Sequence, residues 1–132
     1  MCKLFRVLGA ALAGLAVALG AFGAHGLQQL TQEEKIIQTY QTGVQYQLWH
    51  AIALLIVGLS FVANRISYFK WAGISFLTGI LFFSGSLYAI TYLRLHQQPV
   101  GWWGPVTPLG GLFFILGWVL LAIAFFTNEK SN

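Results

Sequence analysis

Long apolar stretches alternate with short polar ones along the whole chain. Asp, Glu, Lys and Arg are absent from four stretches, which cover residues 7–32, 36–64, 71–93 and 95–128. A bilayer core of about 30 Å is crossed by about 20 helical residues, and an open strand cannot cross it because lipid offers no hydrogen-bond partners. The pattern therefore predicts four membrane-spanning helices, over residues 4–24, 47–63, 71–93 and 106–127.

The connections between these spans differ in character. Thr31 and Glu34 have capping-box spacing, and the apolar positions that follow repeat at helical intervals, so an amphipathic helix is expected there. It either lies in the membrane interface or continues into the second span. The connection at 64–70 is short, as between antiparallel neighbours. The connection at 94–111 contains Pro99, Pro105 and Pro108, which predict an interruption of the helix.

The fold class predicted is an all-α integral membrane protein. Its four helices form an antiparallel bundle, with the amphipathic helix between spans one and two, and residues 1–132 form a single domain. Small residues recur at every fourth position of the first span, including Gly14 and Gly20. Such stripes let helices approach closely in lipid, so we expect the first helix to be central and Gly14, Gly20 and Gly85 to be packing positions. The same stripe is compatible with homo-oligomerisation.

Composition supports a membrane protein and excludes a soluble one. Hydrophobic residues make up 58% of the 132 residues and charged residues only 8%, against about 25% charged in a typical soluble domain. The seven Lys and Arg residues are scattered, so the net charge of +4 forms no nucleic-acid-binding patch. The expected surroundings are the lipid bilayer, with a membrane-protein partner or a second copy of the chain as candidate associates, and no nucleic acid.

The positions of the basic residues predict the orientation in the membrane. Five of them belong to the N-terminus, the second connection and the C-terminal tail, namely Lys3, Arg6, Arg65, Lys70 and Lys130. Only Lys35 and Arg94 belong to the other two connections. By the positive-inside rule both termini are expected in the cytoplasm. The first span imitates a secretion signal, but its length and the three spans after it argue against cleavage.

Polar side chains gather in the halves of the spans that lie away from the predicted cytoplasmic side. Such residues usually face the interior of a bundle or a wet cavity. They predict one outward-facing polar pocket lined by His25, Tyr46, His50, Ser84, Ser86, Tyr88 and Thr107. Simpler interpretations stay open: His25 at a helix end, His50 bonded to a neighbouring Tyr or Ser, and hydroxyl groups bonded to their own helix.

Catalytic chemistry has little support in the sequence. Cys2 is the single cysteine, which excludes an intramolecular disulfide and a cysteine zinc site. His25 and His50, on adjacent helices, suggest a bis-histidine haem site. A zinc site would need a third ligand such as His96. The three acids lie outside the spans, and phosphate-loop and triad motifs are absent. We therefore assign no catalytic residue, metal or cofactor and expect a non-enzymatic protein.

Three hypotheses follow from these residues. The first is association with another membrane component through the small-residue stripes. The second is binding or transport of a small molecule or lipid headgroup in the polar pocket. The third is an enzyme or electron carrier that uses His50.

Four motifs carry a resemblance to a known family. They are GAFGAHGL at 20–27, QTGVQYQLWHAIALL at 41–55, LFFSGSLYAI at 81–90 and VTPLGGLFFILGW at 106–118. Together they resemble the small bacterial inner-membrane proteins catalogued as domain of unknown function family 423, the YgdD-like proteins. The resemblance implies a four-helix protein of the plasma membrane and brings no established activity. Gln45 stands where some relatives have an acid, so any acid chemistry at that position would be lacking here.

Overall fold

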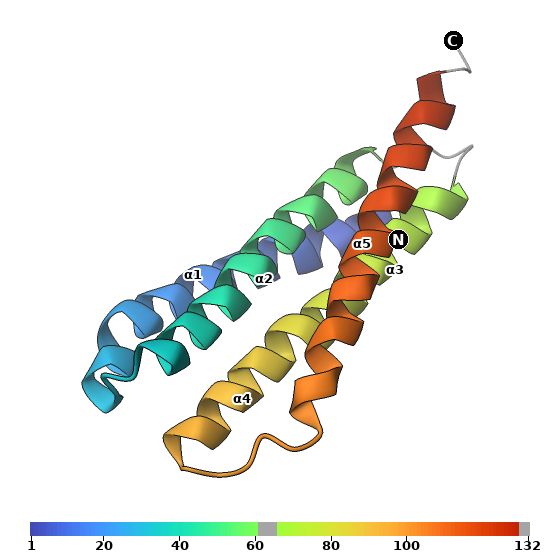
Figure 1. The fold of residues 1–132 in the computed structure, drawn as a ribbon. Coiled ribbons are helices and arrows are strands. Elements are labelled where there is room, and N and C mark those ends of the chain that lie inside the picture. The colour runs from blue at the N-terminus through green and yellow to red at the C-terminus, as the bar shows by residue number, and fades with distance from the viewer. Residues whose placement is uncertain (61–65, 130–132) are drawn as a thin grey trace.

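The computed structural model describes residues 1–60 and 66–129, and its regular structure in these ranges is helical. The helices are α1 (Cys2–Leu30), α2 (Glu34–Ser60), α3 (Ile66–Gly79), α4 (Gly85–Leu95) and α5 (Trp103–Glu129), and a π-helical segment, η2 (Ile80–Ser84), joins α3 to α4 without a break (Figure 1). Four helical columns are long and apolar enough to cross a membrane: Cys2–Leu30, Glu34–Ser60, Tyr68–Leu95 and Trp103–Thr127. The predicted number of spans is confirmed.

The first two helices are longer than predicted. α1 continues to Leu30 rather than ending near Ala24, so His25 and Gly26 lie inside a helix. α2 begins at Glu34 and continues as one helix into the second span, so the amphipathic segment is its first part and not a separate element. Thr31 accepts a 3.1 Å hydrogen bond from the backbone N–H of Glu33 through its hydroxyl. The predicted span end at Ala63 lies outside the described residues.

The connection between α4 and α5 is shorter than predicted. α5 begins at Trp103, so Pro105 and Pro108 lie within this helix and only Pro99 lies in the connection. Gln97 has a positive φ of 53°, and the N–H of Gln98 donates to the carbonyl of Leu93 at 2.8 Å, a C-terminal motif that usually has glycine in this place. Pro105 falls in the first turn of α5, where backbone N–H groups have no intrahelical acceptor. Pro108 lies inside α5, as in the predicted fourth span of 106–127, and the predicted interruption is confined to residues 96–102.

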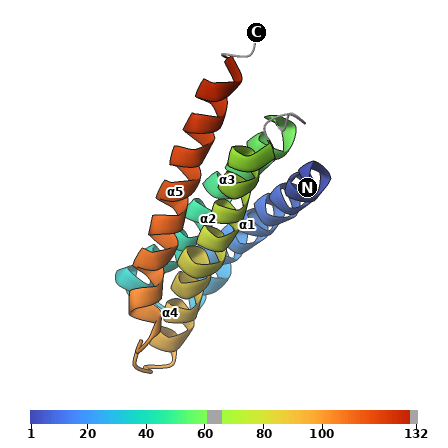
Figure 2. The same cartoon turned by 90° about the vertical axis from the view of Figure 1, so that its right-hand side faces the viewer.

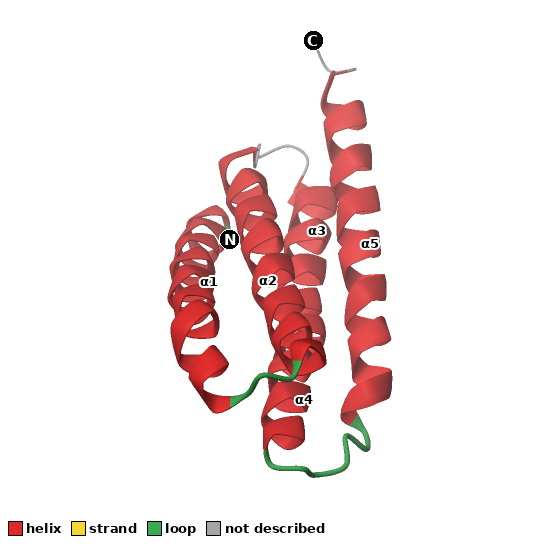
Figure 3. Ribbon diagram, turned by 60° about the vertical axis from the view of Figure 1, so that its left-hand side comes forward, coloured by secondary structure: helices red, strands yellow, loops and turns green. Residues whose placement is uncertain are grey.

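The helices form a row in which α1 and α5 occupy opposite sides. α2 and the α3–η2–α4 column lie between them (Figures 2 and 3). α1 packs chiefly against α2, and only 17% of its most apolar stretch is buried, compared with 50% for α2. The prediction that the first helix is central was therefore wrong, because the small residues pack on one neighbour only.

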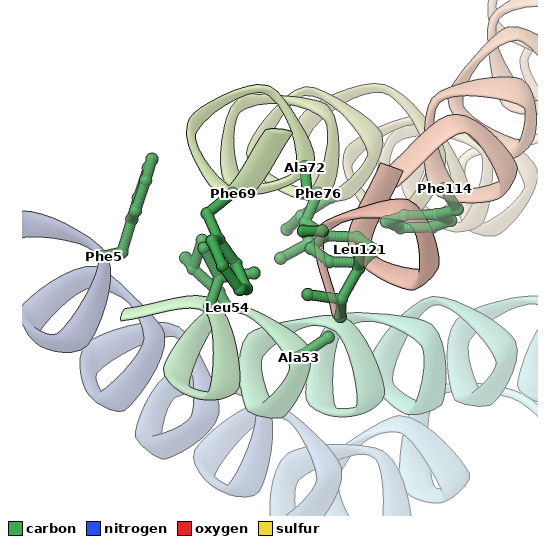
Figure 4. Packing of buried hydrophobic residues seen from close by; sticks show 11 residues of the cluster. Phe5, Ala53, Leu54, Phe69, Ala72, Phe76, Phe114 and Leu121 are labelled. Atoms are coloured by element: carbon green, nitrogen blue, oxygen red, sulfur yellow. The ribbon is translucent and has the colours of Figure 1, made fainter. Parts of the chain in front are cut away.

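The hydrophobic core occupies one half of the bundle, near the starts of α1 and α3. Phe69 and Phe76 of α3 are fully buried, and Phe69 points toward Leu54 of α2 (Figure 4). Phe5 of α1 closes the core by packing its ring on Gly73 of α3. A Cβ added at Gly73 would lie only 2.6 Å from this ring. The other half of the bundle contains five of the six buried polar side chains of the described residues, namely Gln47, His50, Ser84, Ser86 and Thr91, whereas the sixth, Ser75, lies beside Phe76 in α3.

Two of the three predicted packing glycines have no close contact with another helix of the described chain. A Cβ on Gly14 or Gly85 would meet no atom within 4 Å, whereas one on Gly20 would touch Val44 at 3.4 Å. α1 instead meets α2 at Gly9, where a Cβ would lie 3.0 Å from the carbonyl oxygen of Ala51. The regular spacing of small residues indicated close packing, but it did not indicate which stripe faces α2.

Candidate functional site

Gln47 is the centre of a hydrogen-bonded contact between three helices. Its side chain is 2% exposed. Its Nε2 donates to the carbonyl oxygen of Leu12 in α1 at 2.9 Å, and its Oε1 accepts from the hydroxyl of Tyr88 in α4 at 2.8 Å. Tyr40, whose ring centroid lies 5.4 Å from that of Tyr88, donates to the carbonyl oxygen of Leu19 at 2.7 Å. The arrangement joins α2 to α1 and α4 through the membrane interior.

The sequence contained a signal for Gln47 that our prediction missed. Gly43, Gln47, His50 and Leu54 are spaced as one face of a helix, and all four are buried. Gln45, which lies in a family motif, is exposed instead. Gly43 leaves room for Tyr88, whose ring would lie 3.1 Å from a Cβ at this position. Gln45 and Gln47 both lie in the motif at 41–55, so the helical face of each residue, and not motif membership, distinguishes the buried glutamine from the exposed one.

His50 is held in one neutral form between α2 and α5. Its Nε2 accepts a hydrogen bond of 3.1 Å from the indole N–H of Trp118. The ring proton must then reside on Nδ1, which lies 2.7 Å from the carbonyl oxygen of Tyr46 and donates to it. The ring also stacks on Phe114 with a centroid separation of 3.5 Å. Both nitrogens are therefore occupied within the chain.

The hydroxyl groups of the third and fourth spans fall into three classes: bonded between helices, bonded to their own helix, and without a partner in the described part of the chain. Ser86, which is fully buried, lies 2.6 Å from the hydroxyl of Thr107 and 2.8 Å from the carbonyl oxygen of Phe83, to which it donates. Thr91 donates to the carbonyl oxygen of Leu87 in its own helix, as the simpler interpretation anticipated. Ser84 Oγ is buried and has no hydrogen-bond partner among the described residues.

His25 lies apart from the other predicted pocket residues. It is exposed on α1, several turns from the point where Leu12 meets Gln47, and it neither ends its helix nor faces His50. A bis-histidine haem site therefore has no support in this geometry. Among the described residues no group of three His, Cys, Asp or Glu side chains is placed to hold a metal ion.

The predicted polar pocket corresponds to three separate contacts and two cavities with mainly apolar walls. Tyr88 bonds to Gln47, His50 to Trp118, and Ser86 to Thr107. The first cavity, of about 390 Å³, is lined by Tyr46, Trp49, His50, Phe83, Gly111, Phe114, Ile115 and Trp118. The second, of about 290 Å³, is lined by Phe22, Leu27, Leu30, Tyr40, Tyr88, Thr91, Tyr92, Leu95 and His96. Ligand binding by the predicted residues stays a prediction.

The chain is similar to a family of bacterial membrane proteins. The family described as "Protein of unknown function (DUF423)" matches residues 19–111. A UPF0382 membrane protein of Staphylococcus aureus is 42% identical over 94% of this chain and 96% of its own length. The UPF0382 membrane protein YwdK of Bacillus subtilis is 42% identical over 92% of this chain and 95% of its own. A relative from Haemophilus influenzae is 42% identical over 86% of each chain. No solved structure matches.

Proposed function

We propose that this chain, which belongs to the DUF423 family of membrane proteins of unknown function, acts by association with another membrane component and not as an enzyme. It would do so as an antiparallel four-helix bundle in the bacterial inner membrane. The proposal depends on one observation, the uncovered outer face of α1.

The outer face of α1 carries small residues that no other helix of the chain covers. Ala10, Gly14 and Ala18 are all exposed, and the space around a Cβ on Gly14 is empty to 4 Å. Helices associate in lipid where small residues let their backbones come close. A flat surface of this kind on a peripheral helix is suited to a helix of a second membrane protein or of a second copy.

The buried polar groups give less support to a polar binding pocket. Gln47, His50 and Ser86 each bond to a neighbouring helix or to their own backbone. Within a membrane such bonds hold helices together, and a polar ligand would have to displace them. Association is therefore favoured over the alternative of headgroup binding or transport in a polar pocket.

The orientation is part of the same proposal. The first turns of α1 and α3 lie at one end of the bundle, and the start of α2 and the end of α4 lie at the other (Figure 1). Lys3, Arg6 and Lys70 belong to the first end by their helix positions, and Lys35 and Arg94 to the second. The predicted charges Arg65 and Lys130 lie outside the described residues. By the positive-inside rule the first end faces the cytoplasm, so the α4–α5 connection with Trp102 lies on the outer side.

Substitution of Gly14 tests the proposal. We expect Gly14→Leu to abolish co-purification of the partner, or of a second copy, when tagged protein is extracted in mild detergent and weighed by native mass spectrometry. The wider side chain would keep the approaching helix away. Ala122→Leu, at an exposed position of α5, is the matched control and should leave the complex intact.

Two results would count against association at this face. One is that neither another protein nor a second copy of the chain co-purifies with the wild type. The other is a complex that survives Gly14→Leu unchanged. Thermal unfolding of both variants should match the wild type, because a Cβ at Gly14 would meet no atom of another helix within 4 Å. Loss of the complex would then not reflect loss of the fold.

A further inference from the structure

The cavity between α2 and α5 is an aromatic slot at half the height of the bundle. Six of its eight lining residues have aromatic rings: Tyr46, Trp49, His50, Phe83, Phe114 and Trp118. Tyr46 and His50 lie near the middle of α2, and Phe114 and Trp118 near the middle of α5. The slot therefore lies near the centre of the membrane, away from the headgroups.

The slot exists because α2 and α5 meet through their rings rather than their backbones. His50 reaches across to Phe114 and Trp118, and Tyr46 stacks on Phe83 with centroids 4.5 Å apart. Trp49 and Trp118 remain about half exposed, at 52% and 46%. In a bilayer these exposed rings face lipid, so a hydrophobic molecule has a sideways route into the slot.

Two residues that line this slot, Tyr46 and Trp49, carry hydrogen-bond donors that have no partner among the described residues. Neither the Tyr46 hydroxyl nor the Trp49 indole N–H bonds to any described residue, whereas both nitrogens of His50 are occupied. An unsatisfied polar group in hydrocarbon is costly, and water is scarce at this depth. A ligand with acceptor oxygens would satisfy the two donors.

We propose that this slot binds a flat, uncharged ring that bears carbonyl oxygens, of the quinone class. Aromatic walls favour a planar ring over an acyl chain, because ring faces and edges attract one another beyond simple burial. An acyl chain would gain little, since lipid tails offer it the same contacts outside. The cavity of about 390 Å³ lies within the usual range for small-molecule sites. This site lies on α2 and α5 and is independent of association through α1.

Tryptophan fluorescence gives a direct test. Trp49 and Trp118 line the slot, while Trp71, Trp102 and Trp103 do not. In phosphatidylcholine nanodiscs, decylubiquinone should quench a variant that retains only Trp49 and Trp118 in a saturable way. A variant that retains only the other three tryptophans should show weak quenching that rises linearly with quinone concentration.

Two substitutions locate the binding. Gly111→Leu fills the slot, because a Cβ there has open space up to Phe83 Cδ2 at 3.8 Å, and should abolish saturable quenching. Gly104→Leu, at a position with no atom within 4 Å of a Cβ, should have no effect. Tyr46→Phe keeps the ring and removes one donor, so it should weaken binding by about fivefold.

Three outcomes would overturn the proposal. The first is linear quenching in both tryptophan sets, and the second is saturable quenching that survives Gly111→Leu. The third is displacement of decylubiquinone by equal concentrations of oleic acid, which would show that the slot accepts acyl chains. None of these outcomes bears on the association experiment with Gly14→Leu, because that substitution lies on a different helix.

Discussion

The two outer helices are attached to the middle of the bundle in different ways. α1 is attached to α2 by small residues and by polar side chains that reach its backbone. Gln47 and Tyr40 of α2 donate to the carbonyl oxygens of Leu12 and Leu19. These carbonyl groups lie inside a regular helix, so the side chains of α2 add a second hydrogen bond to each of them.

α5 is attached to the α3–η2 column by reciprocal pairs of glycine and phenylalanine. Phe76 packs over Gly117, Phe114 over Gly79, and the backbone of Phe83 over Gly110. The pairs advance by three and then four residues along the α3–η2 column and go back by the same numbers along α5. The hydrogen bond between Ser86 and Thr107 continues this register by three more residues. Here shape, with little hydrogen bonding, determines how the helices fit.

The difference shows two solutions to one physical problem. Between helices in lipid there is no hydrophobic driving force, so association depends on close packing and interhelical hydrogen bonds. The α3–α5 contact depends mainly on packing, and the α1–α2 contact uses hydrogen bonds as well. Substitutions that add volume should therefore damage the first contact most, and removal of a polar group should damage the second.

The largest effect is expected from Gly110→Ala. A Cβ at this position would lie 2.7 Å from Cα of Phe83, and a backbone atom cannot turn aside as a side chain can. The two helices would have to separate, which we expect to lower the free energy of unfolding by about 3 kcal/mol. Unfolding in mixed micelles with increasing SDS would measure this loss.

Gly104→Ala is the matched control on the same helix. Its Cβ would meet no atom within 4 Å, and the free energy of unfolding should stay within about 0.5 kcal/mol of the wild type. Equal stability of the Gly110→Ala and Gly104→Ala proteins would show that reciprocal packing does not determine the α3–α5 contact.

A smaller effect is expected from Gln47→Leu. The change removes the bond to α1 and leaves the Tyr88 hydroxyl without its acceptor. Interhelical hydrogen bonds in membranes contribute about 0.6 kcal/mol each on average, so a loss of about 1–2 kcal/mol in unfolding free energy is expected. A double-mutant cycle with Tyr88→Phe should give a coupling near 0.6 kcal/mol. A coupling of zero would contradict the hydrogen-bonded contact.

Stretches without charged residues were sufficient to predict four helices. Each stretch is long enough to cross the bilayer, and a backbone in lipid must form its hydrogen bonds within the helix. These stretches did not predict where the helices end. His25 suggested an end of α1 that the helix passes, and α5 begins at Trp103, before Pro105 and ahead of the predicted start at 106. Single polar or helix-breaking residues are tolerated when the rest of the helix is held by its neighbours.

The candidate site was harder to predict than the fold, because pairing depends on the rotation of each helix about its axis. Their positions in the outer halves of the spans placed Ser86 and His50 in the predicted pocket, but only the structure shows that Ser86 bonds to Thr107 and His50 to Trp118. Small residues lie both on the exposed face of α1, at Gly14, and on the face that packs against α2, at Gly9 and Gly23. Hydrophobic pattern alone does not distinguish them when lipid and protein interior are equally apolar.

The smallest effect compares two buried serines on either side of the junction between η2 and α4. Ser86 bonds to Thr107 and to the carbonyl oxygen of Phe83, whereas Ser84 Oγ has no partner among the described residues. Ser86→Ala should therefore lower the unfolding free energy by about 0.6 kcal/mol, and Ser84→Ala should be neutral or slightly stabilising because it removes an unpaired hydroxyl. Both substitutions remove one oxygen from a fully buried side chain, so the difference between them isolates the hydrogen bond. If Ser84→Ala proved the more harmful, the Ser84 hydroxyl would have a partner, such as a bound water, and the π-helical segment would contribute a polar contact to the α3–α5 side of the bundle.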